Sequence, residues 1–336
     1  MARRGGWARV GSRRRFRYVD RLGNPISDRE RLERISALAI PPAWKDVWIS
    51  ARPDAAIQAT GIDAAGRKQY RYHPAFRAAQ EQKKFDRLVR FGESLPGLRE
   101  SMAAHVEADL TEDWACALAV RVINRAWFRV VAERAAREAR TYGVTTLTKR
   151  HVALRGSRIT FRFSAKGRIS VRTTLVDDDL ARSFGLLLGL PGSRLFRFQR
   201  QDGLANLSAP SLNRYLGLHL GGGFTAKDFR TWGGSLTAAI ALAEHGPPGS
   251  ASEGKRVVAA AMRRVAEELG NTPAVARASY VSPAVVEQYL DGRTLEHFRP
   301  RSLRLVGARS PGLDLEEAAL LSLLRSYRIR RARLAA

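Results

Sequence analysis

The chain has 336 residues and a formal net charge of +26, from 58 Lys and Arg against 32 Asp and Glu. Hydrophobic residues make up 45% of it, enough for a folded core, so a wholly disordered chain is excluded and the length predicts roughly two domains. A positive charge of this size repels itself unless a polyanion is bound. We therefore expect nucleic acid as the partner, with an anionic membrane surface as the second candidate.

The single cysteine, Cys116, excludes an internal disulfide and a multi-cysteine metal site. No apolar run reaches the ~18 residues that a membrane-spanning helix needs, so we expect a cytoplasmic, nucleoid-associated protein with no membrane partner. The first residues, MARRGGWARVGSRRRFR, hold seven arginines and no acidic residue. They form either a basic arm along phosphates or a disordered solubilising tail, and the arginines between 325 and 333 leave the same choice.

Residues 16–72 have the pattern of short β-strands separated by turns. The clearest case is IQATGIDAAGRKQYRYH, which alternates around Asp63–Gly66 as a hairpin does. The N-terminal part of the chain is therefore expected to be mostly β.

Residues 75–90 favour a helix, and FGESLPGLRE follows them with two glycines and a proline. These residues predict a break in the helix. We place the domain boundary there, between an N-terminal domain over residues 1–90 and a larger, mainly helical domain over residues 91–336.

The second part of the chain has mainly helical patterning. Ser101–Arg140 contains no Pro or Gly and has apolar residues at helical spacing. Residues 158–172 alternate instead, which predicts a β-hairpin with Lys166 and Gly167 at its tip. Residues 211–244 again have the pattern of helices, in two segments on either side of Gly221–Gly223.

After this helical segment, His245–Gly254 has the composition of a flexible linker. Lys255–Leu269 predicts a helix that ends at Gly270, and Ser282 followed by a proline predicts the start of another. The expected fold class is α+β.

Four strings of the second part hold residues suited to chemistry on a phosphate. RVVAERAAREARTYGVTTL is expected to be a basic helix that begins at Arg129, FRFSAKGRIS puts Lys166 on the hairpin tip, and FTAKDFRTWGG holds Arg230. ELGNTPAVARASYVSP places Asn271 and Tyr280 between two helices. No single string is decisive.

Together with GRKQYRYHP in the first part, these strings resemble the ordered motifs of the type IB DNA topoisomerases of the small bacterial and poxviral kind. The resemblance covers nearly the whole chain apart from its basic ends and the linker. It implies a catalytic set of five residues, namely Tyr280, Arg129, Lys166, Arg230 and Asn271. An ungapped match from YGVTTL gives Arg129, which we prefer over Arg121, because that alternative requires a gap.

The resemblance implies that Tyr280 attacks a DNA phosphodiester and forms a 3′-phosphotyrosyl link, which the free 5′-hydroxyl later reverses without ATP, metal or another cofactor. Lys166 would protonate the leaving 5′-oxygen, and the arginines and Asn271 would bind the phosphate. The partner would be double-stranded DNA, held by a monomeric clamp. The DNA-binding residues would be Arg67, Lys68, Gln69, Tyr70 and Tyr72.

Two other functions remain open, a tyrosine recombinase and a non-catalytic basic DNA-packaging protein. Lys227 stands where recombinases usually have a histidine, which favours the topoisomerase. The chain also departs from the family pattern at four positions where the usual residue is absent, Ala165, Val131, Ala132 and Ala135. The last three replace the expected Gly, Asn and Tyr of a segment whose polar members contact DNA in relatives, so sequence preference cannot be carried over.

Overall fold

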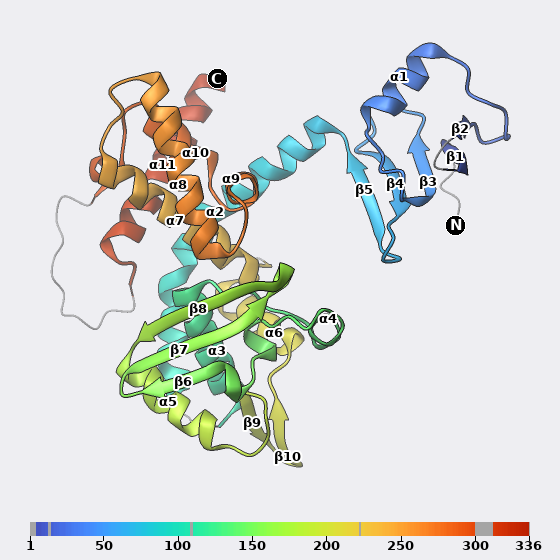
Figure 1. Cartoon of the computed structure of the whole chain (residues 1–336). Helices are drawn as coiled ribbons and strands as arrows, with labels where there is room; N and C mark the ends of the chain where they lie inside the picture. Colours follow the sequence, from blue (N-terminus) through green and yellow to red (C-terminus); the bar gives the residue numbers. More distant parts are fainter. Residues whose placement is uncertain (1–4, 13–14, 108–109, 222, 300–311, 336) are drawn as a thin grey trace. The chain divides into compact units, whose positions relative to one another are not determined.

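The computed structural model describes residues 5–12, 15–107, 110–221, 223–299 and 312–335 (Figure 1). The chain divides into two compact units, Met1–Lys84 and Phe85–Ala336, so the division falls slightly before the expected boundary at residue 90. Four of the N-terminal arginines, at positions 3, 4, 13 and 14, lie outside the described residues.

In the described residues the first unit holds a five-stranded antiparallel sheet, one short helix and the first residues of α2 (Pro74–Val106). Its elements are β1 (Gly6–Ser12), β2 (Arg15–Val19), α1 (Arg29–Ala37), β3 (Lys45–Ser50), β4 (Ile57–Ile62) and β5 (Lys68–Tyr72). The strand order is β2-β1-β3-β4-β5, and a small core forms around Trp7, Ile35 and Ile49. The expected hairpin is confirmed as β4 and β5, and β5 is an edge strand.

The second unit is mainly helical, with two small antiparallel sheets. Its elements are α3 (Glu112–Ala126), α4 (Glu133–Ala139), β6 (Val152–Arg155), β7 (Arg158–Ala165), β8 (Ile169–Val176), α5 (Asp178–Gly189), β9 (Arg197–Arg200), β10 (Gly203–Asn206), α6 (Ala209–Leu220), α7 (Ala226–His245), α8 (Ala251–Leu269), α9 (Pro273–Ser279), α10 (Pro283–Leu290) and α11 (Leu315–Ala335). Helices α3 and α5 pack on the sheet β6-β7-β8 (Figure 1). The α+β fold class is confirmed.

Helix α2 (Pro74–Val106) runs without interruption through the residues that were expected to break it. Phe91, Leu95 and Leu98 follow one face at helical spacing and are completely buried. A Cβ at Gly92 would lie 2.5 Å from the Trp232 ring, so the glycine is there for close packing. Tertiary burial therefore outweighs the local cost of Gly and Pro in the helix.

The expected helical patterning over Ser101–Arg140 is confirmed as the end of α2, all of α3 and all of α4. Thr111 caps the start of α3 by accepting from the Trp114 amide. Trp127 ends α3 in a left-handed conformation, with φ 51°. Consequently Arg129 lies in a non-helical segment between α3 and α4 and does not begin a helix.

The predicted linker His245–Gly254 is also shorter than expected. Helix α8 begins at Ala251, because Ser250 caps it by accepting from the Glu253 amide. The glycine stop after Leu269 is confirmed, with Gly270 at φ 58°. The hairpin β7–β8, the division between α6 and α7 and the start of α10 after Ser282 are confirmed as well.

Candidate active site

Tyr280 follows α9 directly and is half-buried. Its backbone is fixed by α7, where the Ser235 hydroxyl donates to the Tyr280 carbonyl oxygen at 3.2 Å and accepts from the Ser282 amide at 3.0 Å. A Cβ at Gly234 would lie 2.9 Å from the same carbonyl oxygen. Only a glycine therefore lets α7 approach Tyr280 this closely.

Arg230 lies one turn earlier on α7 and is 5% exposed. Its two terminal nitrogens donate to the carbonyl oxygens of Trp127 and Leu269, each at 2.6 Å. Its guanidinium carbon lies 4.9 Å from the centre of the Tyr280 ring. Burial, and then the charge of Arg129, lower the pKa of Arg230, yet a guanidinium stays charged under all ordinary conditions.

Arg129 reaches the same place from the segment after α3. Its Nη2 donates to Asn271 Oδ1 at 2.7 Å and to the Gly270 carbonyl oxygen at 3.4 Å. Its own carbonyl oxygen accepts from the Val144 amide at 2.9 Å. A Cβ at Gly143 would lie 2.3 Å from that oxygen, so the glycine of the YGVTTL string is needed to hold Arg129.

The two arginines set the electrostatics of the tyrosine. Burial raises the pKa of Tyr280, but the charge and hydrogen bonding of Arg230, and then those of Arg129, lower it by more, so the net shift of the pKa is downward. The arrangement thus favours the phenolate, the more nucleophilic form of the side chain.

Asn271 lies in the turn after α8 and completes the cluster. Its Nδ2 donates to the Leu269 carbonyl oxygen at 3.1 Å, while its Oδ1 accepts from Arg129. The structure thus brings four of the five expected catalytic residues together, from α7, α9 and two loops.

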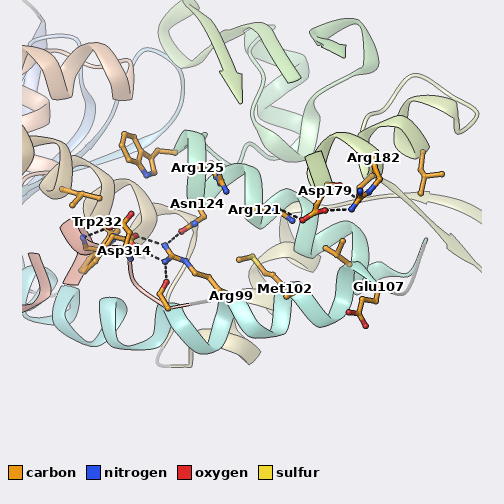
Figure 2. Close-up of a pocket in the computed structure, with 18 residues that line it drawn as sticks. Arg99, Met102, Glu107, Arg121, Asn124, Arg125, Asp179, Arg182, Trp232 and Asp314 are labelled. Atoms are coloured by element: carbon orange, nitrogen blue, oxygen red, sulfur yellow. Dashed lines mark hydrogen bonds and ion pairs between the residues drawn. The ribbon is translucent and has the colours of Figure 1, made fainter. Parts of the chain in front are cut away.

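The alternative arginine, Arg121, has a different environment. Its guanidinium pairs with both carboxylate oxygens of Asp177, with contacts of 2.7 to 3.1 Å. With Arg125 it lines a cavity of about 1290 Å³ between α2, α3, α5 and α7 (Figure 2). Arg121 therefore has a structural ion pair, whereas Arg129 lies beside Asn271.

Lys166 is exposed at the tip of the β7–β8 hairpin, where Gly167 takes φ 80°. In the described part of the chain its ammonium makes no hydrogen bond to the cluster. Its neighbours Ala165 and Ile169 nevertheless line a cavity of about 550 Å³ together with Arg129 and Arg230. The hairpin tip thus borders the space above the two arginines.

The expected DNA-binding residues lie on and beside β5. Lys68, Tyr70 and Tyr72 are exposed on one face of this edge strand, and the two tyrosine rings are stacked with centroids 5.8 Å apart. Gln69 points to the other face and donates to Asp63 at 2.8 Å. The amide and the side chain of Arg67 hold the pKa of Asp63 at about 2, so this turn carries an ion pair.

Sequence reasoning missed the residues that position the cluster, Gly143, Gly234 and Ser235. The signal was present in the strings TYGVTTL and RTWGGS, where small residues directly adjoin the candidate residues. In the described ranges no group of three or more His, Cys, Asp or Glu side chains could hold a metal ion, and no helix is long and apolar enough to cross a membrane.

Comparison with known proteins defines the class. Residues 73–295 match the family described as eukaryotic DNA topoisomerase I, catalytic core, and residues 15–63 match the family described as bacterial DNA topoisomerase IB, N-terminal domain. DNA topoisomerase 1B of Acanthamoeba polyphaga mimivirus is 33% identical over 267 residues, which is 77% of this chain and 80% of the viral protein. The chain belongs to the type IB DNA topoisomerase family and is an enzyme of that family, as the sequence motifs indicated.

Proposed function

We propose that this enzyme relaxes supercoiled DNA by a tyrosine-based, metal- and ATP-independent breakage of one strand. The observation that carries the proposal is the position of Tyr280 against Arg230, with Arg129 and Asn271 beside them. A nucleophile with a lowered pKa and two guanidinium groups are what an attack on a phosphodiester requires.

In the proposed step Tyr280 releases its phenolic proton to water, and the phenolate oxygen attacks phosphorus. The bond from phosphorus to the 5′-oxygen breaks, and that oxygen takes a proton from Lys166. Arg129 and Arg230 donate to the non-bridging oxygens. The 5′-alkoxide needs the proton because its conjugate acid is a far weaker acid than a phenol, whose pKa is ~10.

Resealing is the reverse of cleavage. The 5′-hydroxyl attacks the phosphotyrosyl bond, returns its proton to Lys166 and displaces the phenolate, which is a good leaving group. Between the two steps the cut strand rotates about the intact one. The energy of the original phosphodiester is kept in the phosphotyrosyl bond, so no ATP is consumed.

We infer that double-stranded DNA is held by a monomer, with residues 1–90 as the clamp domain and 91–336 as the catalytic domain. The exposed row of Lys68, Tyr70 and Tyr72 suits contact with DNA, and Arg67 and Gln69 complete the proposed set. The protein would act at the nucleoid in the cytoplasm.

The test is plasmid relaxation without ATP and with EDTA, comparing wild type with Tyr280→Phe. Tyr289→Phe is the matched control, because the Tyr289 hydroxyl is buried and has no hydrogen-bond partner in the described residues. We expect the first variant to be inactive and the control to retain activity. Relaxation by Tyr280→Phe would disprove the proposal. Strand exchange between specific sites would indicate a recombinase, and DNA binding without nicking would indicate a packaging protein.

A further inference from the structure

The sheet β6-β7-β8 has one open face that carries arginines and no acidic residue. Arg155, Arg158, Arg162 and Arg172 are exposed on this face, which we call the arginine face. The opposite face buries Ile159, Phe161 and Phe163 against the core of the second unit. Residues 152–176 contain no Asp or Glu at all.

The strand register places these arginines in like-charged pairs. Arg162 lies directly opposite Arg172, and Arg155 lies directly opposite Arg158. Side chains paired in this way have Cβ atoms ~5 Å apart, and like charges at that position destabilise a sheet. The arrangement works against the stability of the free protein, so the fold does not account for it.

Several exposed arginines elsewhere in the described part of the chain are paired with carboxylates. On the helices, for example, Arg134 pairs with Glu138 at 2.8 Å, and Arg29 pairs with Glu33 at 2.9 Å. On the arginine face, by contrast, none of the four makes an ion pair within the described part of the chain. Four guanidinium groups without carboxylates form a surface complementary to phosphates.

The position of the face identifies which phosphates these are. The strands lead away from the hairpin tip, where Ala165 and Ile169 border the cavity of Arg129 and Arg230. From there to Arg158 is seven residues of β7, or about 23 Å of strand. Since a DNA duplex rises ~3.4 Å per nucleotide along its axis, this length measured along the axis corresponds to about seven nucleotides.

We propose that the arginine face is a phosphate-binding track for the duplex that is being cleaved, extending about seven nucleotides from the active site. The Thr160 and Thr174 hydroxyls, 3.0 Å apart between the arginine pairs, add hydrogen-bonding groups to the same face. The proposal rests on the proposed function, because it assigns this surface to the DNA held at Tyr280.

The test compares Arg158→Gln/Arg162→Gln with the control Lys255→Gln/Arg263→Gln, which removes two exposed charges from α8. Binding of labelled random-sequence duplexes of increasing length is measured against salt concentration. In one-to-one complexes on long duplexes, we expect the arginine variant to make the fall of log binding constant with log salt concentration less steep, by about 0.9 per arginine. On duplexes too short to reach the track, the change should be smaller. The control should reduce the steepness less.

Equal slopes for the two variants would overturn the proposal. It would also be overturned if the change in slope appeared only in complexes that hold two duplexes, because the face would then bind a duplex other than the one at Tyr280. Urea unfolding in low salt gives an independent measurement. The midpoint should rise in the arginine variant, because both like-charged pairs are broken, and a lower midpoint would show that the arginines serve the fold. Formation of the covalent complex at low salt should be unchanged in the Lys255→Gln/Arg263→Gln control, and its absence in wild type would refute the proposed function instead.

Discussion

Arg230 lies against the ring of Tyr280, with the guanidinium carbon 4.9 Å from the ring centroid. The two residues are 50 positions apart in the chain and meet because Gly234 allows α7 to contact the Tyr280 backbone. The positive charge therefore acts directly on the phenol, and this contact leads to the first prediction.

Replacing Arg230 by Gln should raise the pKa of Tyr280. Burial alone raises that pKa, and the arginine charges reverse the shift in the wild-type protein. In wild type the phenolate fraction at a given pH is larger than for an ordinary tyrosine, and in Arg230→Gln it should be smaller. The measurement is a spectrophotometric titration, taken as the difference between each protein and its Tyr280→Phe counterpart. An unchanged inflection would contradict the assignment.

Arg129 and Arg121 should give opposite phenotypes. Arg129→Ala should lower the single-turnover cleavage rate by about 10²- to 10³-fold, the usual effect of losing one transition-state donor, with little loss of stability. Arg121→Ala should leave cleavage nearly intact and lower the free energy of unfolding by about 2 kcal/mol, because Asp177 loses its closer partner and keeps Arg125 at 3.4 Å. Cleavage assays and urea unfolding separate the two, and the reverse pattern would favour Arg121 as the catalytic residue.

Lys166→Ala should slow cleavage by about 10²- to 10⁴-fold, which is the range for a lost general acid. A substrate with a 5′-thio leaving group should largely restore the rate, since a thiol has a pKa of ~8.5 and leaves without a proton. Arg168→Ala, at the same hairpin tip, is the control and should behave like wild type on both substrates. If the sulfur substrate does not rescue Lys166→Ala, the lysine has another role.

Ser235→Ala should reduce both stability and cleavage. The substitution leaves the buried Ser282 amide and the Tyr280 carbonyl without their partner, which costs about 1 to 3 kcal/mol. Because the hydroxyl fixes the Tyr280 backbone, the cleavage rate should fall even under conditions where the variant is fully folded. Ser183→Ala, another buried serine, should lower stability only slightly and leave the cleavage rate unchanged. Equal cleavage rates for the two would show that Ser235 serves the fold alone.

His151 should make the free energy of unfolding depend on pH. Burial, and then the charges of Arg150 and Arg194, lower the pKa of His151 to about 4. The unfolded imidazole takes up its proton near pH 6.5, so stability falls as the pH drops from about 6.5 to about 4, by up to about 3 kcal/mol. Protonation also removes the hydrogen bond from the Thr148 amide to Nδ1. Urea unfolding at pH 7 and pH 5 should show a smaller pH effect in His151→Gln.

Much of the local structure could be predicted from the residues themselves. Alternation located the hairpin around Lys166, because Ile159 and Phe161 are buried and their neighbours are not. Gly270 marked the end of a helix, because its left-handed conformation suits a residue without a side chain. Alternation and a glycine stop depend only on residues close together in the sequence, so they can be recognised without knowledge of the tertiary structure.

The errors have non-local causes. Helix α2 continues through Pro96 because Phe91 and Leu98 are buried by segments far away in the chain. The amino-acid composition stays typical of a helix beyond Trp127, but the helix itself ends there, where the backbone takes a left-handed conformation. Composition and spacing also gave no indication that residues 129, 230, 271 and 280 meet; the resemblance to a family supplied that set, and the packing glycines that join them were missed.

The carbonyl oxygens of Trp127 and Leu269 have a consequence for the thermodynamics of the site. Because they already hold both terminal nitrogens of Arg230, the side chain has one rotamer before any DNA arrives, and little conformational entropy remains to be lost on binding. The two bonds use two of the five guanidinium N–H groups, so donors on the terminal nitrogens are left for an incoming phosphate oxygen. The site is preorganised, and its affinity for the reacting phosphate does not depend on folding a loose arginine around it.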